Sequence, residues 1–168
     1  MFDLTGKTAM ITGSSRGIGK GMALFLAKAG ADIIVNYNSA IEEANEVVCE
    51  IKKLGRNAIA AKCDVSDPNQ VEAMFKDIDK LDILINNAGT SQSKDIFEMD
   101  INDWDRVIKI NLTSGFLCSK YAMEIMKKQN SGRIIFISSV VGQRGALFGH
   151  LHYAATKSGQ LGMVKTLA

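Results

Sequence analysis

Near its start, this 168-residue sequence reads Thr8-Ala9-Met10-Ile11, followed at once by Thr12-Gly13-Ser14-Ser15-Arg16-Gly17-Ile18-Gly19. A short apolar run that ends in a glycine-rich turn predicts a strand leading into a helix. Glycines let the turn curl tightly and let a pyrophosphate approach the backbone amides and the positive end of the helix. The spacing is neither GxGxxG nor a P-loop, and the glycines could serve close packing alone. Three glycines between a strand and a helix nevertheless favour cofactor binding.

Four further apolar runs alternate with segments of helical period. The runs cover residues 33–35, 58–61, 81–85 and 133–137. This alternation is typical of a parallel sheet covered by helices on both faces, so the sequence predicts a three-layer α/β/α fold. A long helical region is expected over residues 102–129, and another from about residue 153.

Three amphipathic helices are expected between the first four strands. The first ends at Gly30 as a C-cap, and the second ends at Gly55. The second has Ser39 and Glu42 at capping-box spacing, and Asp67 is the expected N-cap of the third. The buried stripes are expected to be Ile18, Met22, Phe25, Leu26 and Ala29 in the first helix, Ile41, Ala44, Val48 and Ile51 in the second, and Val71, Met74, Phe75 and Ile78 in the third.

Length and composition predict one globular domain over residues 1–168. The net charge of +2 gives no reason to expect nucleic acid or an acidic membrane surface, and no run approaches the ~20 apolar residues of a membrane span. No secretory signal is expected. The widely spaced Cys49, Cys63 and Cys118 suggest free thiols in a reducing cytoplasm. His150 and His152 lack a third ligand at metal spacing, so no metal is expected, and loop or substrate-facing positions are predicted for both.

The residues after the second strand bear on the choice of nicotinamide cofactor. In NAD-binding folds, an acidic residue about 20 positions beyond the glycine turn bonds the ribose 2′-hydroxyl. This sequence has Asn36-Tyr37-Asn38 there, while Arg16 places a positive charge inside the turn. A cation suits a phosphorylated ribose, so NADP(H) is favoured over NAD(H), unless Arg16 is only a solvent-facing loop residue.

Two further motifs occupy positions suited to a site. Asn86-Asn87-Ala88-Gly89 follows the fourth strand, where open parallel sheets bind ligands, although Asn and Gly also favour ordinary turns. Tyr153 and Lys157 are four residues apart and share one face of the predicted helix. An ammonium beside a phenol stabilises the phenolate, so the pair could transfer a proton. It could equally be a half-buried ring beside a solvated cation.

In this order, the motifs resemble the short-chain dehydrogenase/reductase family over essentially the whole sequence. The resemblance implies a doubly wound Rossmann fold with strand order 3-2-1-4-5, and hydride transfer between a nicotinamide and a carbonyl or secondary alcohol. It is carried by residues 12–19, Asp64-Val65, residues 86–89, Asn111, Ser138-Ser139 before Val140-Val141-Gly142, and residues 153–157.

The resemblance assigns a role to each of four residues, Asn111, Ser139, Tyr153 and Lys157. Ser139 would hydrogen-bond the substrate oxygen, and Tyr153 would give that oxygen its proton. Lys157 would assist the tyrosine and bind the nicotinamide ribose, while Asn111 would help hold a water-linked proton path to the lysine. Ser138 competes with Ser139 because neighbouring strand residues point to opposite faces. The family places its serine directly before Val-Val-Gly, which favours Ser139.

The same resemblance implies a set of cofactor-binding residues. Asp64 and Val65 would border the adenine, unless Asp64 only caps the turn before the third helix. The implied set is Gly13, Ser15, Arg16, Gly17, Ile18, Gly19, Asn36, Asp64, Val65, Asn87, Ala88, Gly89, Tyr153 and Lys157.

Within the family, the pattern most resembles 3-oxoacyl-[acyl-carrier-protein] reductases of fatty acid biosynthesis, with glucose-type sugar dehydrogenases second. A catalytically inactive dinucleotide-binding module is the alternative from another class. The resemblance also implies a homodimer or homotetramer formed through the helices at residues 102–129 and from 153 onward. Family members have more residues before the fourth strand and further strands after the position of Ala168, so we expect a sequence that is incomplete at its C-terminus.

Overall fold

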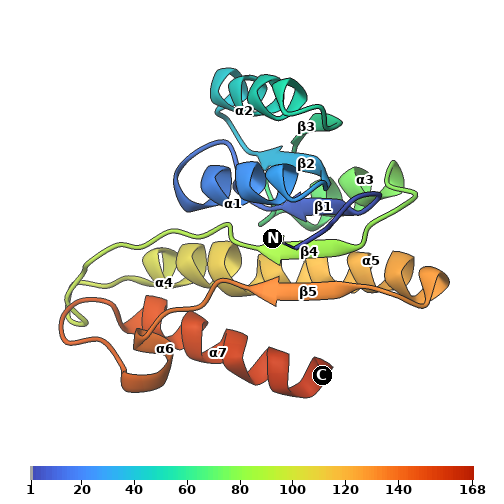
Figure 1. The fold of residues 1–168 in the computed structure, drawn as a ribbon. Helices are drawn as coiled ribbons and strands as arrows, with labels where there is room; N and C mark the ends of the chain where they lie inside the picture. The colour runs from blue at the N-terminus through green and yellow to red at the C-terminus, as the bar shows by residue number, and fades with distance from the viewer. Residues whose placement is uncertain (1) are drawn as a thin grey trace.

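The apolar runs form one parallel sheet, as the sequence predicts. The computed structural model describes residues 2–168, and its five strands lie in the order β3-β2-β1-β4-β5 (Figure 1). This order confirms the predicted doubly wound Rossmann topology. The strands are β1 (Thr8–Ile11), β2 (Asp32–Tyr37), β3 (Ala58–Lys62), β4 (Ile83–Asn86) and β5 (Arg133–Phe136).

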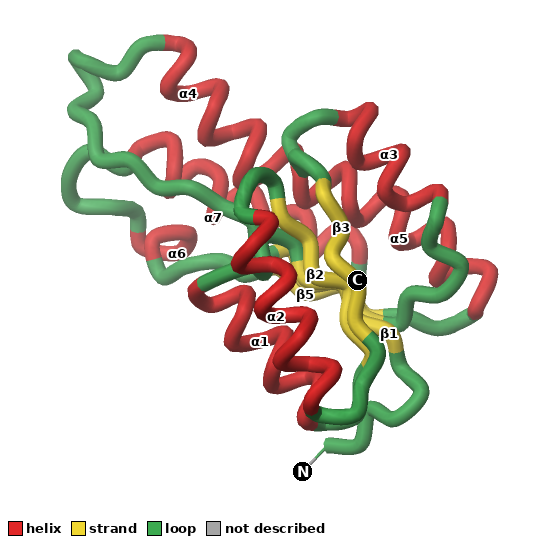
Figure 2. The backbone as a smooth tube through the Cα atoms, turned by 90° about the horizontal axis from the view of Figure 1, so that it is seen from above, coloured by secondary structure: helices red, strands yellow, loops and turns green. Residues whose placement is uncertain are grey.

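Helices cover both faces of this sheet. Figure 2 shows α1 and α2 together on one side of the strands, with α3 and α5 on the other. The α7 helix packs against α4, the π-helical turn η1 and α6. The helical elements are α1 (Gly17–Lys28), α2 (Ile41–Lys53), α3 (Pro68–Lys76), α4 (Ile101–Ile108), η1 (Lys109–Thr113), α5 (Ser114–Gln129), α6 (Val141–Arg144) and α7 (Leu151–Leu167).

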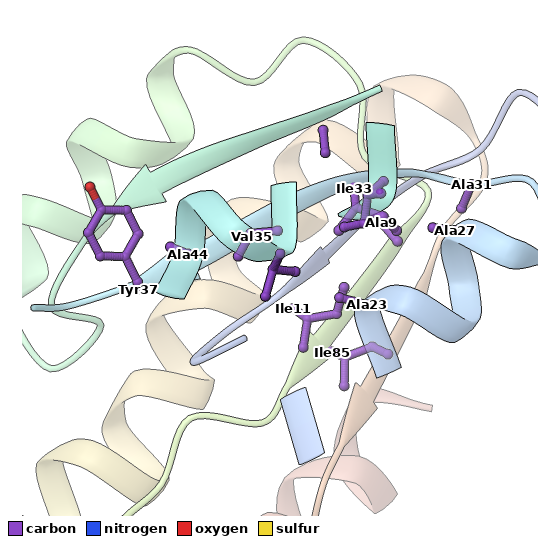
Figure 3. Close-up of a cluster of buried hydrophobic side chains, with 13 residues drawn as sticks. Ala9, Ile11, Ala23, Ala27, Ala31, Ile33, Val35, Tyr37, Ala44 and Ile85 are labelled. Atoms are coloured by element: carbon purple, nitrogen blue, oxygen red, sulfur yellow. The ribbon is translucent and has the colours of Figure 1, made fainter. Parts of the chain in front are cut away.

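Each face of the sheet carries its own apolar core, because side chains alternate along a strand. Ala9 and Ile11 of β1 point into the cluster shown in Figure 3, together with Ala23 of α1 and Ala44 of α2. Met10, between them in sequence, points the other way. It joins a second cluster with residues of α3 and α5, among them Val71, Phe75, Cys118 and Ala122.

The buried stripe predicted for α1 is wrong at two of its five positions, whereas Ala29 is buried and Met22 and Leu26 pack partly buried against the core. Ile18 and Phe25 are 71% and 61% exposed, and the fully buried positions are Gly19, Ala23 and Ala27. These small residues let the α1 backbone approach the sheet closely, where larger side chains would hold it away. The prediction placed the most hydrophobic side chains against the sheet, whereas close packing of α1 requires small side chains there.

The capping box predicted for α2 is also wrong. The helix begins at Ile41, one residue later than a Ser39 cap requires, and its N-cap Ala40 makes no side-chain hydrogen bond. The Ser39 carbonyl accepts the Ile41 N–H instead. At α3 the prediction is confirmed, since the Asp67 carboxylate accepts the Asn69 and Gln70 amides. The buried stripe predicted for α2 is confirmed at Ala44 and Ile51, but Ile41 is exposed and Val47 is buried more deeply than Val48.

A buried carboxylate joins the amino-terminal ends of the neighbouring strands β1 and β4. Asp82 accepts hydrogen bonds from Lys7 Nζ and from the Thr8 amide, each at 2.9 Å, and Lys80 Nζ lies 3.7 Å away. Burial alone would raise the pKa of Asp82, but the Thr8 amide and the Lys7 ammonium outweigh it and hold the pKa below its usual value.

We expect Asp82→Asn to lower the free energy of unfolding by about 2 kcal/mol at pH 7, because it removes a charge-assisted acceptor. The folded-state pKa is depressed, so this stabilisation is present above the unfolded pKa of about 3.9 and is lost as the pH falls through the folded value. The difference between variant and wild type should therefore shrink below about pH 4. Urea unfolding at pH 7 and about pH 3 measures it. The exposed Asp79→Asn is the matched control, and an equal loss in both variants would contradict the prediction.

No helix within residues 2–168 is long and apolar enough to cross a membrane. Over the same residues, no group of three or more His, Cys, Asp or Glu side chains gathers as a metal site. Burial raises the pKa of Cys63 to about 11 and that of Cys118 to about 12, so both are neutral thiols in the core.

Candidate active site

The glycine turn and the polar turn after β4 are bonded into one unit. The Thr12 hydroxyl oxygen accepts the amides of Asn87 and Ala88, both at 2.9 Å, and Asn87 Nδ2 donates to the Thr12 carbonyl at 2.8 Å. Gly19, in the first turn of α1, lies against this unit. A Cβ there would stand 2.4 Å from the Gly13 carbonyl oxygen. This close approach leaves no room for any side chain. The turn can pack against α1 only because position 19 is glycine.

This unit forms one wall of a cavity of about 450 Å³ at the carboxyl ends of the strands. Its walls include eleven of the predicted cofactor-binding residues, namely Gly13, Ser15, Arg16, Ile18, Gly19, Asn36, Asp64, Val65, Asn87, Ala88 and Gly89. The other three, Gly17, Tyr153 and Lys157, are not among the lining residues. Six further residues that were not predicted also line the cavity: Tyr37, Asn38, Ser39, Ala40, Cys63 and Ile110. Tyr37 is the last residue of β2 and residues 38–40 follow it directly, and this place at a strand's carboxyl end was the available signal.

Three polar residues that line the cavity differ in how far their side chains are already bonded within the protein. Asn36 is buried, and its amide bonds the Gly13 N–H and the Ala61 and Cys63 carbonyls, so it supports the turn. Asp64 accepts the Ser66 amide and hydroxyl, which caps the turn before α3. Arg16 is exposed at the N-cap of α1 and forms no ion pair within residues 2–168. Within residues 2–168, Arg16 is therefore a positively charged side chain of the cavity wall that is not paired with a carboxylate.

Tyr153 and Lys157 lie one above the other on α7, as their spacing predicts. Lys157 Nζ stands 5.5 Å from the centroid of the Tyr153 ring and donates to the Ile137 carbonyl at 2.6 Å. Lys157 is only 5% exposed, and this burial lowers its pKa. The alternative of a solvated cation beside a ring is wrong for this pair. A partly desolvated ammonium beside a phenol is suited to stabilising negative charge on the phenol oxygen.

The two neighbouring serines after β5 make different contacts. Ser138 Oγ donates to the Lys157 carbonyl at 3.0 Å and so fastens β5 to α7. Ser139 Oγ accepts the Val141 amide at 3.4 Å, which leaves its hydroxyl proton available to another acceptor. Gly142 completes the contact with α7, since a Cβ there would lie 2.8 Å from the Lys157 carbonyl carbon. Within residues 2–168, the hydroxyl proton of Ser138 is used in a hydrogen bond and that of Ser139 is not, while the role of Ser139 toward a substrate stays a prediction.

Asn111 joins the cavity wall to α7. Its Oδ1 accepts the Thr90 amide and its Nδ2 donates to the Thr90 carbonyl, both at 2.8 Å. Nδ2 also lies 3.4 Å from Thr156 Oγ1, which donates to the Tyr153 carbonyl at 2.7 Å. Asn111 sits in η1, a π turn between α4 and α5, and these three elements together form the long helical region predicted over residues 102–129. Such turns often occur at functional sites.

The two histidines lie in different places. The His150 ring, at the N-cap of α7, makes an edge contact with the Tyr153 ring at 6.2 Å between centroids. His152 is fully buried, so the predicted loop or substrate-facing position is wrong for it. Burial lowers the pKa of His152. Its Nδ1 accepts the Tyr153 amide at 2.9 Å, which fixes the start of α7 next to the tyrosine.

Comparison with known proteins agrees with this arrangement. The family model described as short chain dehydrogenase matches residues 7–168. A 3-oxoacyl-[acyl-carrier-protein] reductase of Synechocystis sp. is 43% identical over 172 aligned positions, which cover 100% of this chain and 69% of the relative. The 3-oxoacyl-[acyl-carrier-protein] reductase FabG of Staphylococcus aureus is 42% identical over 166 positions, covering 96% of this chain and 67% of the relative.

Two solved structures of dehydrogenases superpose closely on this chain. A protein of Agrobacterium tumefaciens assigned as a gluconate dehydrogenase superposes with a TM-score of 0.94 at 36% identity. One of Sinorhizobium meliloti assigned as a short-chain alcohol dehydrogenase superposes with a TM-score of 0.92 at 37% identity. Each match covers 99% of this chain and 67% of the solved one.

Proposed function

The chain belongs to the short-chain dehydrogenase family and is an oxidoreductase, and we propose that it reduces 3-oxoacyl-[acyl-carrier-protein] substrates with NADPH. The observation that carries the chemistry is the buried Lys157 ammonium beside the Tyr153 ring. Both lie on a helix that Asn111 fastens to the wall of the cavity of about 450 Å³. The two relatives named as 3-oxoacyl-[acyl-carrier-protein] reductases support the substrate.

The cavity suits a nicotinamide dinucleotide. Gly19 lets the glycine turn pack closely against the positive N-terminal end of α1, where a pyrophosphate is stabilised. Asp64 and Val65 would border the adenine, and Arg16 would meet a phosphate on its ribose. Gly89 lies next to Asn111, so the nicotinamide end would point toward α7. When bound, the reduced cofactor supplies a hydride to the carbonyl carbon.

The chain's own residues would handle the substrate oxygen. Hydride addition builds negative charge on that oxygen, so a fixed hydroxyl donor stabilises the transition state more than the ground state. Ser139 would hold the oxygen through its available proton, and Tyr153 would deliver the proton that makes the alcohol. Lys157 would stabilise the phenolate that remains on Tyr153, and the Asn111 to Thr156 contact would keep the helix in place.

A panel of carbonyl substrates tests this proposal. We expect 3-oxoacyl thioesters to be reduced faster than simple ketones or sugars, with NADPH absorbance as the readout. The exposed Leu147 and Phe148, close to His150 in the chain, offer apolar surface for an acyl chain. Faster oxidation of glucose with NADP⁺, followed as the appearance of NADPH, would favour the sugar dehydrogenase alternative. The relative assigned as a gluconate dehydrogenase supports a sugar-derived substrate. Cofactor binding without turnover on any substrate would favour an inactive binding module.

Arg16 gives a test of cofactor choice. We expect Arg16→Ala to weaken NADPH binding about tenfold and NADH binding less than about twofold, because only NADPH offers a phosphate to the guanidinium. Titration of both reduced cofactors by fluorescence measures the two dissociation constants. Lys28→Ala, which removes an exposed charge from the other end of α1, is the control and should change neither. Equal weakening of NADPH and NADH by Arg16→Ala would rule out the preference for NADP(H).

Assembly, location and domain structure complete the proposal. We propose a homodimer or homotetramer that buries the exposed apolar side chains of α5 and α7, which include Phe116, Met123 and Leu167. We propose a single domain, since both core clusters pack on one sheet. The three free thiols support a cytoplasmic location.

A further inference from the structure

A stripe of buried polar residues runs along α7 beside the Tyr153 and Lys157 column. His152, Thr156 and Gln160 are spaced four residues apart, so they share one helical face, and they are 0%, 0% and 2% exposed. A helix face packed against other helices is usually apolar. Polar side chains buried there need hydrogen-bond partners, and those partners show what each residue does.

Gln160 finds its partner in the π turn. Its Nε2 donates to the Asn111 carbonyl at 2.8 Å. The preceding carbonyl of the turn, that of Ile110, accepts the Ser114 hydroxyl at 2.6 Å. A π turn breaks the regular helical hydrogen-bond ladder, and here two successive carbonyls bond side chains. Gln160 therefore supplies, from another helix, a donor to the backbone of the turn that holds Asn111.

The hydrogen bonds continue from Asn111 to the proposed proton donor. The Asn111 amide bonds Thr90 and meets Thr156, and Thr156 donates to the Tyr153 carbonyl. Gln160 thus holds the backbone of Asn111 by a hydrogen bond, while the side chain of Asn111 connects the cavity wall to α7. We propose that Gln160 is a positioning residue, which sets the orientation of Asn111 and through it the position of Tyr153. This inference rests on the proposed reductase function.

Packing alone does not account for a glutamine at this position. Gln160 Oε1 is buried and has no hydrogen-bond partner within residues 2–168. A leucine or methionine would fill a similar volume without burying an unpaired acceptor, which is unfavourable. The single bond from Nε2 to Asn111 is the one polar contact that the buried amide makes in the described chain. The contact, and not the volume, distinguishes glutamine from its apolar counterparts.

The first experiment removes the donor and keeps the volume. We expect Gln160→Leu and Gln160→Met each to lower kcat about tenfold, the loss of one hydrogen bond, with the NADPH dissociation constant unchanged. Amide hydrogen exchange at Thr90, whose N–H donates to Asn111 Oδ1, should become about tenfold faster in both. Gly162→Ala is the control. It lies two residues away on the exposed side of α7, where a methyl group meets nothing within 4 Å, and it should leave both readouts unchanged.

A double-mutant cycle separates positioning from a merely structural role. In an Asn111→Ala background, Gln160→Leu should change kcat less than about twofold, because the group through which it acts is gone. An equal tenfold loss in both backgrounds would overturn the proposal. So would wild-type kcat and Thr90 exchange in both Gln160 variants. If the wild-type enzyme turned over no substrate, the proposed function would fail, and Thr90 exchange alone would decide whether Gln160 holds Asn111.

Discussion

Tyr153→Phe is expected to lower kcat about a thousandfold while the NADPH dissociation constant stays within about twofold of wild type. The substitution removes one oxygen atom and keeps the ring, its edge contact with His150 and its distance from Lys157. General acid catalysis by a positioned side chain contributes about 10²-fold to 10⁴-fold, so the loss of the phenol should fall in that range. The cofactor cavity is lined by other residues, so binding of NADPH should survive.

Single-turnover kinetics with bound NADPH measure this effect without interference from product release. Tyr121→Phe is the matched control, because Tyr121 lies on α5, where its ring stacks on Phe75 at 5.9 Å between centroids. It removes the same hydroxyl group from a tyrosine outside the proposed site and should leave kcat within about twofold. A Tyr153→Phe enzyme within tenfold of wild type would remove the tyrosine from the proposed mechanism.

The strands could be predicted because each is a short apolar run, and their alternation with helices indicates a parallel sheet. The order of the strands was implied by the family resemblance. The Asp67 cap was predictable for a local reason, since carboxylate and proline at a helix start act over three or four residues. The α1 stripe could not be predicted from hydrophobicity. Ala23 and Ala27 are buried because α1 must approach the sheet closely, a requirement of the assembled layers.

In the site, too, features set by nearby residues could be predicted, whereas features set by contacts between distant segments could not. Spacing and residue type predicted that Tyr153 and Lys157 share one helical face and that the glycine turn joins a strand to a helix. The structure gathers around one cavity eleven of the fourteen cofactor residues that the family resemblance implies. Gln160 was not predictable. Its role depends on a π turn at Asn111 that no short pattern in the sequence specifies, and on the register of α7 against that turn. Contacts between distant segments appear only once the helices are packed.

Gly19→Ala is expected to weaken NADPH binding about 100-fold and to lower the free energy of unfolding by about 3 kcal/mol. The added Cβ would stand 2.4 Å from the Gly13 carbonyl oxygen, 2.7 Å from Asn87 Nδ2 and 2.8 Å from Ser14 Cα. Two of these three atoms belong to the backbone, which cannot turn aside as a flexible side chain can. The turn must therefore open, and the amides that would meet the pyrophosphate move with it.

Gly21→Ala provides the control within the same helix. Gly21 is exposed, and a Cβ there meets nothing within 4 Å, so alanine should stabilise the chain by about 0.5–1 kcal/mol through its better helix propensity. Fluorescence titration with NADPH and urea unfolding give both quantities for each variant. Opposite effects of one methyl group, two residues apart in α1, would show that close approach is what requires glycine at position 19. NADPH binding within threefold of wild type in Gly19→Ala would contradict that requirement, because the cofactor would then tolerate a turn that the added methyl group has opened.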